Sequence, residues 1–353
     1  MKLATAKALP QADLAHVLQF ARQDLEKLRG ASLFVTGGTG FFGKWLVSTF
    51  LHANRKLQLG DSMTVLTRDP ERFRTECPDQ AVDRALVLHP GDVRTFTFPE
   101  GKFSHLILGA SSAGEGPLDL FSTIVDGTRH TLDFAKQCGA RRVLFLSSGA
   151  VYGQQPADIT HIPETYLGGP DPLQPGSTYG EAKRVAEHLC CAFSAAHGLE
   201  AVIARCFAFS GPHLPLDANF AIGNFMGDAL ASRPISIQGD GTPYRSYLYA
   251  ADLAVWLWAL LARGMSGRAY NVGSDEDVTI ADLAHAVADQ SGTAAGVYIA
   301  KTAVPGVPAS RYVPSIDRAR AELGLTPHIR LRDGISRTFE WLRQASPVAK
   351  SAP

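Results

Sequence analysis

The 353-residue sequence has no excess of charge of either sign and few cysteines. Lys plus Arg and Asp plus Glu both number 34, so the formal net charge is zero. Such a balance provides no overall field that would attract nucleic acid or an anionic membrane surface. The five cysteines form no Cys-x-x-Cys pair and show no metal-ligand spacing. This pattern favours reduced thiols over a disulfide framework or a metal site, so we expect neither nucleic acid nor metal as a ligand.

Long hydrophobic runs are also absent. The most apolar stretch, residues 253–261, is too short to span a bilayer and directly follows Asp252. The first residues lack the charged, apolar and small-residue segments of a signal peptide. We therefore expect a cytoplasmic protein with no membrane partner. The length and the hydrophobic fraction of 45% allow one large α/β domain with a smaller lobe.

A glycine-rich stretch, V-T-G-G-T-G-F-F-G at residues 35–43, follows an apolar run of strand length and precedes a helix-like segment. Gly37 allows the chain to turn, Gly40 lets the backbone approach a pyrophosphate, and Gly43 lets the helix pack closely on the strand. The start of the helix offers unpaired N–H groups and a partial positive charge to an anion. The stretch predicts a dinucleotide-binding turn.

The end of the second predicted strand bears on the choice of cofactor. Residues 63–66 form that strand, and Thr67 and Arg68 follow it. An enzyme that prefers NAD commonly has an acidic residue here, which holds the ribose 2′-hydroxyl. A guanidinium instead suits a 2′-phosphate by charge and by paired hydrogen bonds. The sequence thus favours NADP over NAD, the alternative being that Arg68 is a solvated loop residue.

Further apolar strands alternate with helical segments, which predicts a parallel sheet covered on both faces, a doubly wound Rossmann-like α/β fold. After the third strand, Asp92 could accept a hydrogen bond from an adenine amino group, with Val93 against the ring. The fourth strand ends in Ser111 and Ser112, whose small side chains leave room for a ligand.

Tyr179 and Lys183 are four residues apart at the start of a predicted helix, so their side chains share one face. A tyrosine with its ordinary pKa near 10 is a poor base at neutral pH. A nearby ammonium and a cationic nicotinamide would lower that pKa towards the working range. Ser148, at the end of the fifth strand, could hydrogen-bond the same substrate oxygen.

On these residues the sequence resembles the extended short-chain dehydrogenase/reductase family, in its nucleotide-sugar epimerase/dehydratase branch. The resemblance runs from about residue 30 to residue 344. Its motifs are T-G-G-T-G-F-F-G (36–43), G-D-V-R (91–94), S-S-G-A-V-Y-G (147–153), Y-G-E-A-K (179–183), A-R-C-F-A-F-S-G-P (204–212), G-N-F-M-G-D-A-L (223–230), G-D-G-T-P-Y-R-S-Y-L-Y-A-A-D-L (239–253) and Y-N-V-G-S (270–274).

The resemblance implies roles for these residues. Tyr179 would be the catalytic base and acid, Lys183 would lower its pKa and hold the nicotinamide ribose, and Ser148 would complete the set. The residues that would bind NAD or NADP are Gly37, Gly40, Phe41, Phe42, Gly43, Arg68, Asp92, Val93, Ala110 and Lys183. Those that would bind a nucleoside-diphosphate sugar are Ser111, Ser112, Ser148, Asn224, Arg245 and Arg311. Of these, Asn224 and Arg245 would hold the diphosphate, and Arg311 is a weaker candidate for it.

The sequence departs from the family pattern at four positions. Sugar 4,6-dehydratases of the family have two acidic residues after the catalytic hydroxyl, and uronate decarboxylases have a glutamate there. Here the residues are Gly149 and Ala150, which cannot move protons, so elimination and decarboxylation by the usual routes are disfavoured. Ala208 and Ile124 replace asparagines that are common in relatives, and this leaves the substrate class open.

The same resemblance gives a domain plan. Residues 1–30 would be a helical extension, 31–206 the NAD(P)-binding domain with the catalytic residues, 207–345 mainly a substrate-binding lobe interleaved with the last sheet elements, and 346–353 a flexible tail. A homodimer is expected through the helices at 118–138 and 178–197.

The predicted activity is hydride transfer at carbon 4 of a nucleoside-diphosphate sugar. An epimerase would retain its cofactor, whereas a 4-ketoreductase would consume NADPH, and Gly149 and Ala150 fit both. The family favours the epimerase and Arg68 favours the reductase. A non-catalytic dinucleotide-binding regulator is the alternative from another class, although such a protein would not need a tuned base.

Overall fold

The computed structural model describes residues 7–111, 116–218, 220–292 and 296–344. Ser112 and the predicted tail at 346–353 lie outside the described residues. The helix predicted at the N-terminal end of the chain is present as α1 (Gln11–Lys27).

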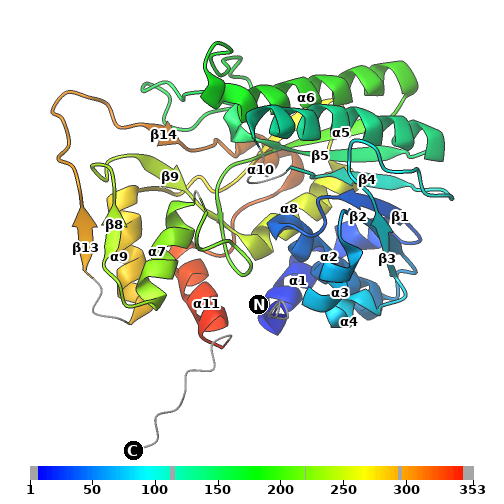
Figure 1. Cartoon of the computed structure of the whole chain (residues 1–353), viewed down its shortest axis with the longest axis horizontal. Coiled ribbons are helices and arrows are strands. Elements are labelled where there is room, and N and C mark those ends of the chain that lie inside the picture. Colours follow the sequence, from blue (N-terminus) through cyan, green and yellow to red (C-terminus); the bar gives the residue numbers. More distant parts are fainter. Residues whose placement is uncertain (1–6, 112–115, 219, 293–295, 345–353) are drawn as a thin grey trace, which may run out of the picture.

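The described residues form a seven-stranded parallel sheet at the centre of the molecule (Figure 1). The strand order is β11-β6-β5-β4-β1-β2-β3, and every pairing is parallel. The strands are β1 (Ser32–Thr36), β2 (Ser62–Thr67), β3 (Leu86–Pro90), β4 (His105–Leu108), β5 (Arg142–Ser148), β6 (Glu200–Cys206) and β11 (Arg268–Val272). The chain enters the sheet at β1, builds outwards to β3, and then returns to build from β4 on the other side. This order confirms the predicted doubly wound fold and places the crevice for a ligand at the carboxyl ends of β1 and β4.

Helices cover both faces of the sheet, because the strands are apolar on both sides. One face packs against α1, α2 (Phe41–Leu57) and α8 (Ala250–Arg263), and the other against α5 (Pro117–Cys138) and α6 (Thr178–His197) (Figure 1). Two short helices, α3 (Pro70–Glu76) and α4 (Pro78–Ala81), follow β2.

A smaller lobe with its own apolar core follows β6. Its helices are α7 (Ala221–Leu230), α9 (Ile280–Ser291) and α11 (Leu331–Arg343). Its strands are β8 (Ile235–Ile237) with β13 (Val297–Ile299), and β9 (Tyr244–Ser246) between β12 (Asp277–Thr279) and β14 (Arg311–Tyr312). Two further short strands, β7 (Phe209–Ser210) and β10 (Leu248–Tyr249), pair together, and α10 (Asp317–Leu323) precedes α11.

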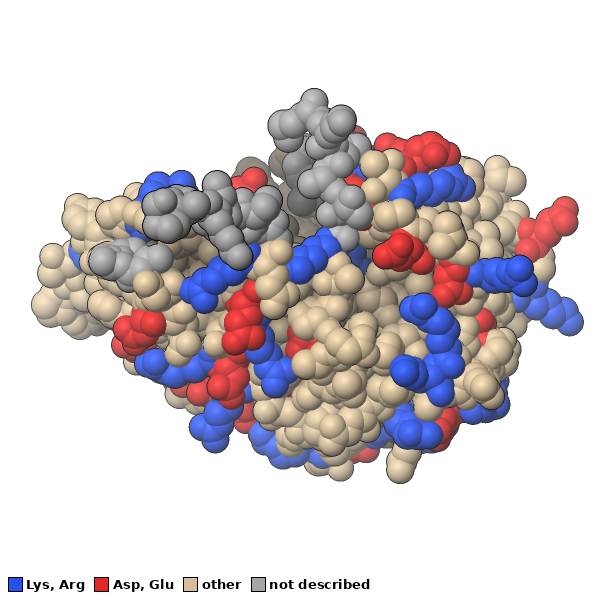
Figure 2. All heavy atoms as spheres, turned by 90° about the horizontal axis from the view of Figure 1, so that it is seen from below, with Lys and Arg blue, Asp and Glu red and all other residues tan. Residues whose placement is uncertain are grey.

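The surface agrees with the charge balance of the sequence. Figure 2 shows acidic and basic side chains interspersed on the face in view, with no large area of one sign. Among the described helices, none is long and apolar enough to cross a bilayer.

Candidate functional site

The glycine turn joins β1 to α2 with almost no space for side chains. Gly37 has φ +75°, and a Cβ there would lie 2.4 Å from the carbonyl oxygen of Gly109. A Cβ on Gly43 would lie 2.2 Å from the carbonyl carbon of Gly38. Both positions therefore require glycine, one for the turn and one for the close packing of α2.

Gly40 differs from Gly37 and Gly43, because the packing of the protein leaves space for a side chain at this position. A Cβ at Gly40 would meet only the oxygen of Gly37, at the ordinary distance of 3.5 Å. Gly40 is also the N-cap of α2, and within the described residues no side chain caps this helix. The space around Gly40 and the lack of a side-chain cap at the start of α2 fit the predicted pyrophosphate of a dinucleotide.

The other predicted cofactor residues lie around the same edge of the sheet. Val93 and Ala110 line a small cavity together with Thr36. Arg68 is exposed at the end of β2. Phe41 and Phe42 begin α2 with half-buried rings, and Phe42 packs edge-on against Phe209.

Asp92 already has a strong partner. Its two carboxylate oxygens accept hydrogen bonds from Arg94 Nε and Nη2, at 2.8 and 2.9 Å. These bonds, ahead of all other influences, lower the pKa of Asp92. Asp92 is therefore ionised and oriented by Arg94, and the predicted adenine contact would use a remaining lone pair of that carboxylate.

The structure brings Ser148, Tyr179 and Lys183 together at the carboxyl end of β5. Ser148 Oγ accepts a hydrogen bond of 3.1 Å from the N–H of Ala150, in a 3₁₀ turn formed by Gly149–Tyr152. Tyr179 lies in the first turn of α6, near enough to Ser148 for that hydroxyl to lower the pKa of Tyr179 in part. Lys183 lies one turn after Tyr179 on α6, and its Nζ donates a 2.7 Å hydrogen bond to the carbonyl oxygen of Leu146 in β5.

The predicted effect of Lys183 and a cationic nicotinamide on the pKa of Tyr179 stays a prediction. Burial raises the pKa of Tyr179, and the nearby Ser148 hydroxyl opposes this only in part. Lys183 Nζ is 5.8 Å from the centre of the Tyr179 ring and points at a backbone carbonyl. Burial also lowers the pKa of Lys183 to about 8. Desolvation is thus the larger effect on both groups.

The three predicted phosphate ligands differ in their surroundings. Asn224 is exposed on α7. Arg245, on β9, donates a 2.7 Å bond to the carbonyl of Tyr244, and its guanidinium is half-buried. Arg311 is paired with Asp277 at 2.7 Å and stacks 4.0 Å above the ring of Tyr244. Arg311 is therefore a weaker candidate than Arg245, because a substrate phosphate would have to compete with a carboxylate.

Sequence reasoning missed one residue of this site. A Cβ at Gly149 would lie 2.8 Å from both Tyr312 Oη and the ring of Phe207. Burial raises the pKa of Tyr312, and the nearby Ser148 hydroxyl opposes this in part. Tyr312 lies in a proline-rich segment without periodicity, so no local pattern marked it. The nearest signal was the neighbouring Arg311.

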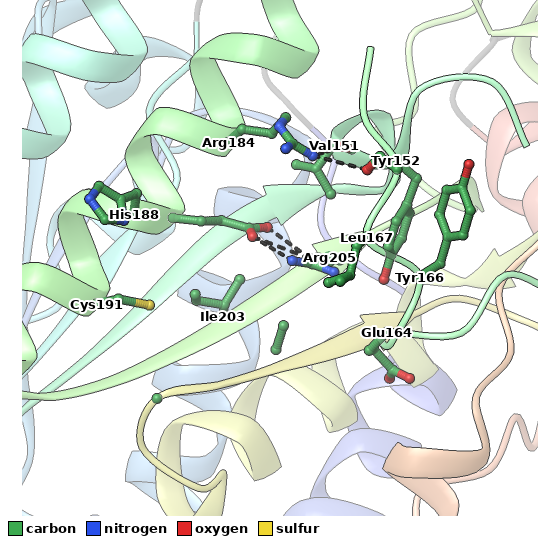
Figure 3. Close-up of a pocket in the computed structure, with 14 residues that line it drawn as sticks. Val151, Tyr152, Glu164, Tyr166, Leu167, Arg184, His188, Cys191, Ile203 and Arg205 are labelled. Carbon is green, nitrogen blue, oxygen red and sulfur yellow. Dashed lines mark hydrogen bonds and ion pairs between the residues drawn. The ribbon is translucent and has the colours of Figure 1, made fainter.

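A cavity of about 340 Å³ lies elsewhere in the molecule (Figure 3). It lies between α6, β6 and the loop at 164–168, and no predicted site residue lines it. Arg205 points across it to Glu187 in an ion pair of 2.7 Å, and Glu187 also accepts a bond of 2.6 Å from Ser147. The polar groups at its centre satisfy one another, which indicates a structural role.

The described residues contain no group of three or more His, Cys, Asp or Glu side chains that could hold a metal ion. All five cysteines are free, and only Cys191 is exposed.

Comparisons with known proteins agree with this geometry. The model of the NAD dependent epimerase/dehydratase family matches residues 33–273. UDP-glucuronic acid decarboxylase 6 of Arabidopsis thaliana is 31% identical over 322 residues, which cover 90% of each chain. UDP-glucuronic acid decarboxylase 1 of Xenopus tropicalis is 26% identical over 317 residues, covering 88% of this chain and 72% of the relative.

Solved structures share the fold. The UDP-glucuronic acid 4-epimerase of Bacillus cereus, in complex with NAD and a fluorinated UDP-glucuronic acid, superposes with a TM-score of 0.75 at 22% identity. The alignment covers 89% of this chain and all 100% of that one. The UDP-glucose 4-epimerase of Thermotoga maritima gives 0.73 at 21% identity, over 89% and 99% of the two chains. The chain therefore belongs to the NAD-dependent epimerase/dehydratase family and is an NAD-dependent enzyme.

Proposed function

We propose that the protein is a C4 epimerase of a UDP-sugar, which oxidises the 4-hydroxyl and then reduces the ketone from the opposite face. The observation that carries this proposal is the meeting of Ser148, Tyr179 and Lys183 beside the glycine turn, with no acidic side chain at positions 149 and 150. The named relatives support UDP as the nucleotide.

Tyr179 and Ser148 have separate roles in the proposed reaction. Tyr179, as the phenolate, takes the proton of the 4-hydroxyl, and Ser148 holds the same oxygen by a hydrogen bond. NAD, when bound at the glycine turn and near Lys183, supplies the acceptor and later the donor of the hydride. As the carbon–hydrogen bond breaks, the carbon–oxygen single bond becomes a carbonyl. On return, Tyr179 gives its proton back to the oxygen, so Tyr179 ends each turnover unchanged.

Arg245 is the proposed ligand of the substrate diphosphate, with Asn224 beside it and Ser111 near the sugar. A guanidinium and a diphosphate form charge-assisted, paired hydrogen bonds. Binding energy at this remote end of the substrate would hold the sugar still while its ring carbon reacts.

Decarboxylation is the second candidate, because the relative with 31% identity is a UDP-glucuronic acid decarboxylase. Oxidation at carbon 4 of a uronic acid makes a β-keto acid, which can lose carbon dioxide. The carbanion then needs a proton at carbon 5. Gly149 and Ala150 provide no acid for that step, so epimerisation is favoured by the residues present.

Product analysis tests the proposal directly. The purified protein is incubated with NAD and either UDP-glucose or UDP-glucuronic acid, and the products are identified by NMR and mass spectrometry. We expect an isomer of unchanged mass with no net change in NADH absorbance. Loss of carbon dioxide would identify a decarboxylase, and consumption of NADPH with a 4-keto sugar would identify a ketoreductase. No turnover of any UDP-sugar would favour the non-catalytic regulator.

A further inference from the structure

A buried carboxyl group of α1 lies where the smaller lobe meets the sheet domain, which is the seven-stranded sheet with its covering helices. Asp13, in the first turn of α1, is 1% exposed. Its Oδ2 accepts a 2.7 Å hydrogen bond from Tyr249 Oη, and its Oδ1 accepts a 3.0 Å bond from Arg337 Nη1. Each oxygen of the carboxyl group therefore has its own partner, one at the end of β10 and one on α11.

The helix that carries Asp13 is itself fixed to the sheet domain. The apolar side chains of Val17 and Leu25 on α1 are buried in the same core as those of α8. Asp24, nearer the end of α1, pairs with Arg263 of α8 at 2.8 Å. Asp13 is thus held on the sheet domain and can serve as a fixed point for the elements that bond to it.

Both partners of Asp13 belong to the part of the molecule that carries the proposed diphosphate ligand. Tyr249 follows Arg245 by four residues, so the strand segment of Arg245 leads directly to the Asp13 contact. Arg337 lies on α11, whose apolar face is part of the core of the smaller lobe. This helix also packs on Tyr249, because a Cβ at Gly334 would lie 2.9 Å from Tyr249 Cδ2.

The segment before α1 makes a second connection to α11, which lies beside α1 (Figure 1). Trp341 Nε1 donates a 2.9 Å bond to the carbonyl oxygen of Ala8, and Lys7 Nζ donates a 2.5 Å bond to the carbonyl oxygen of Trp341. The Trp341 ring also lies 4.9 Å from the ring of His213, in the loop that leads to α7 and Asn224. Residues 7–13 therefore contact the supports of both proposed phosphate ligands.

Apolar packing alone would leave the position of α11 on α1 poorly defined, because the hydrophobic effect has no direction. A buried carboxyl group with two donors tolerates one arrangement, since a shift of either element leaves a polar group unpaired in a dry site. We propose that Asp13 is a positioning residue, which fixes β10 and α11, and with them Arg245, relative to the strand that carries Ser148.

This inference rests on the proposed function, in which Arg245 binds the diphosphate while Ser148 and Tyr179 act on the sugar. One substrate molecule then spans the smaller lobe and the sheet domain. A fixed spacing between these two parts lowers the entropy that substrate binding costs and keeps the reacting carbon in place.

The first test measures the mobility of the lobe without any ligand. In Asp13→Asn the side chain has one acceptor oxygen instead of two, so it cannot accept from both Tyr249 and Arg337. Hydrogen exchange of the full-length protein is followed by mass spectrometry. We expect amides in segments 244–249 and 331–343 to exchange about tenfold faster than in wild type, and amides of β1, β4 and β5 to exchange unchanged.

The second test measures binding. With NAD present, calorimetry should show that Asp13→Asn binds UDP about five- to tenfold more weakly than wild type, while its affinity for NAD stays within about twofold. Asp24→Asn is the matched control, because it changes the same residue type on the same helix at a carboxyl group whose arginine lies on α8. It should leave the affinity for UDP and the exchange of segments 244–249 and 331–343 unchanged.

Tyr249→Phe is the second variant, and it decides the question if Asp13→Asn does not fold. It keeps the ring and removes one donor to Asp13, so its changes should have the same direction. Unchanged exchange and UDP affinity in both variants, or equal changes in Asp24→Asn, would overturn the inference. A wild type that binds UDP but converts no UDP-sugar would contradict the proposed function alone. If the wild type binds no UDP, the proposed substrate is wrong, and the exchange pattern decides whether Asp13 fixes the lobe.

Discussion

At the scale of single residues, the site depends on the desolvation of its acid–base groups. Lys183 is buried and Tyr179 is half-buried, and burial shifts each pKa in the direction that disfavours charge. The pKa of Lys183, at about 8, leaves its ammonium largely protonated at neutral pH. The positive charge therefore persists near the point where a phenolate must form.

Tyr179→Phe tests the assignment of the base. The variant keeps the ring and removes the only group that can take the hydroxyl proton, so we expect kcat to fall about 10² to 10⁴-fold. Binding of NAD, measured by calorimetry, should stay within about twofold of wild type, since the variant removes no charge that attracts the cofactor. Tyr298→Phe, in an exposed strand of the smaller lobe, is the control. Undiminished turnover in Tyr179→Phe would remove Tyr179 from the mechanism.

Arg68 is the residue predicted to bind the 2′-phosphate of NADP. The proposed epimerase should bind NADH more tightly than NADPH. A wild type that prefers NADPH would instead support the ketoreductase. Arg68→Ala should then reduce that preference, the ratio of the two affinities, about tenfold or more, because a guanidinium–phosphate bond contributes about 1.5 to 3 kcal/mol. Fluorescence titration of both cofactors measures the ratio. Arg72→Ala, on α3, removes an exposed guanidinium nearby and should not change it. Equal ratios in wild type and Arg68→Ala would show that Arg68 is a solvated loop residue.

At the scale of elements, the buried residue Asp61 joins α2, β1 and β2. Asp61, just before β2, accepts a 2.9 Å bond from the N–H of Ala31, just before β1. Its own N–H and C=O both bond with the side chain of Asn54, at the end of α2. Burial raises the pKa of Asp61 from 3.8 to about 6, although the bond from Ala31 works against this.

This shift predicts a pH dependence of stability. The folded state prefers the neutral carboxyl, so the contribution of Asp61 to stability is complete below pH 3.8 and is lost as the pH rises through about 6. Asp61→Asn stays neutral and keeps an acceptor for Ala31. At pH 8 we expect the free energy of unfolding of this variant, measured by urea denaturation, to exceed that of wild type by about 1 to 3 kcal/mol. At pH 4 the two free energies should be equal.

The exposed Asp158→Asn is the control for this experiment and should change stability at neither pH. A wild type that is as stable as Asp61→Asn at pH 8 would contradict the raised pKa of Asp61.

The sequence predicted the elements with strong local patterns. The apolar runs of β1, β2, β5 and β6 and the glycines between β1 and α2 are local, and they fixed the sheet and the cofactor turn. Tyr312 could not be placed, because its contact with Gly149 joins segments far apart in the chain through the short β9–β14 pairing. The burial that raises the pKa of Tyr179 could not be predicted for a related reason, since burial depends on the whole fold rather than on the four-residue spacing to Lys183.

At the scale of the whole molecule, α5 and α6 lie side by side on one outer face of the sheet (Figure 1). Leu118 on α5 and Val185 on α6 are exposed apolar side chains, 86% and 38% accessible. The predicted homodimer would bury this face.

We expect light scattering to give a dimer mass at micromolar concentration and Val185→Glu to give a monomer, because a charge at a packed interface is poorly solvated. Val82→Glu places the same charge after α4, away from α5 and α6, and should leave the mass unchanged. A monomer mass for wild type at every concentration would exclude the dimer.

The packing of α1 has a consequence for the order of assembly. Val17, Ala21 and Leu25 of α1 are buried, and α1 packs mainly against α8. Tyr249 at the start of α8 also donates a 2.7 Å bond to Asp13 of α1. On a ribosome, which makes the chain from its N-terminus, α1 appears first and α8 only after the first six strands of the sheet. The apolar face of α1 is therefore left without its partner through most of synthesis, and the first helix made completes its packing late.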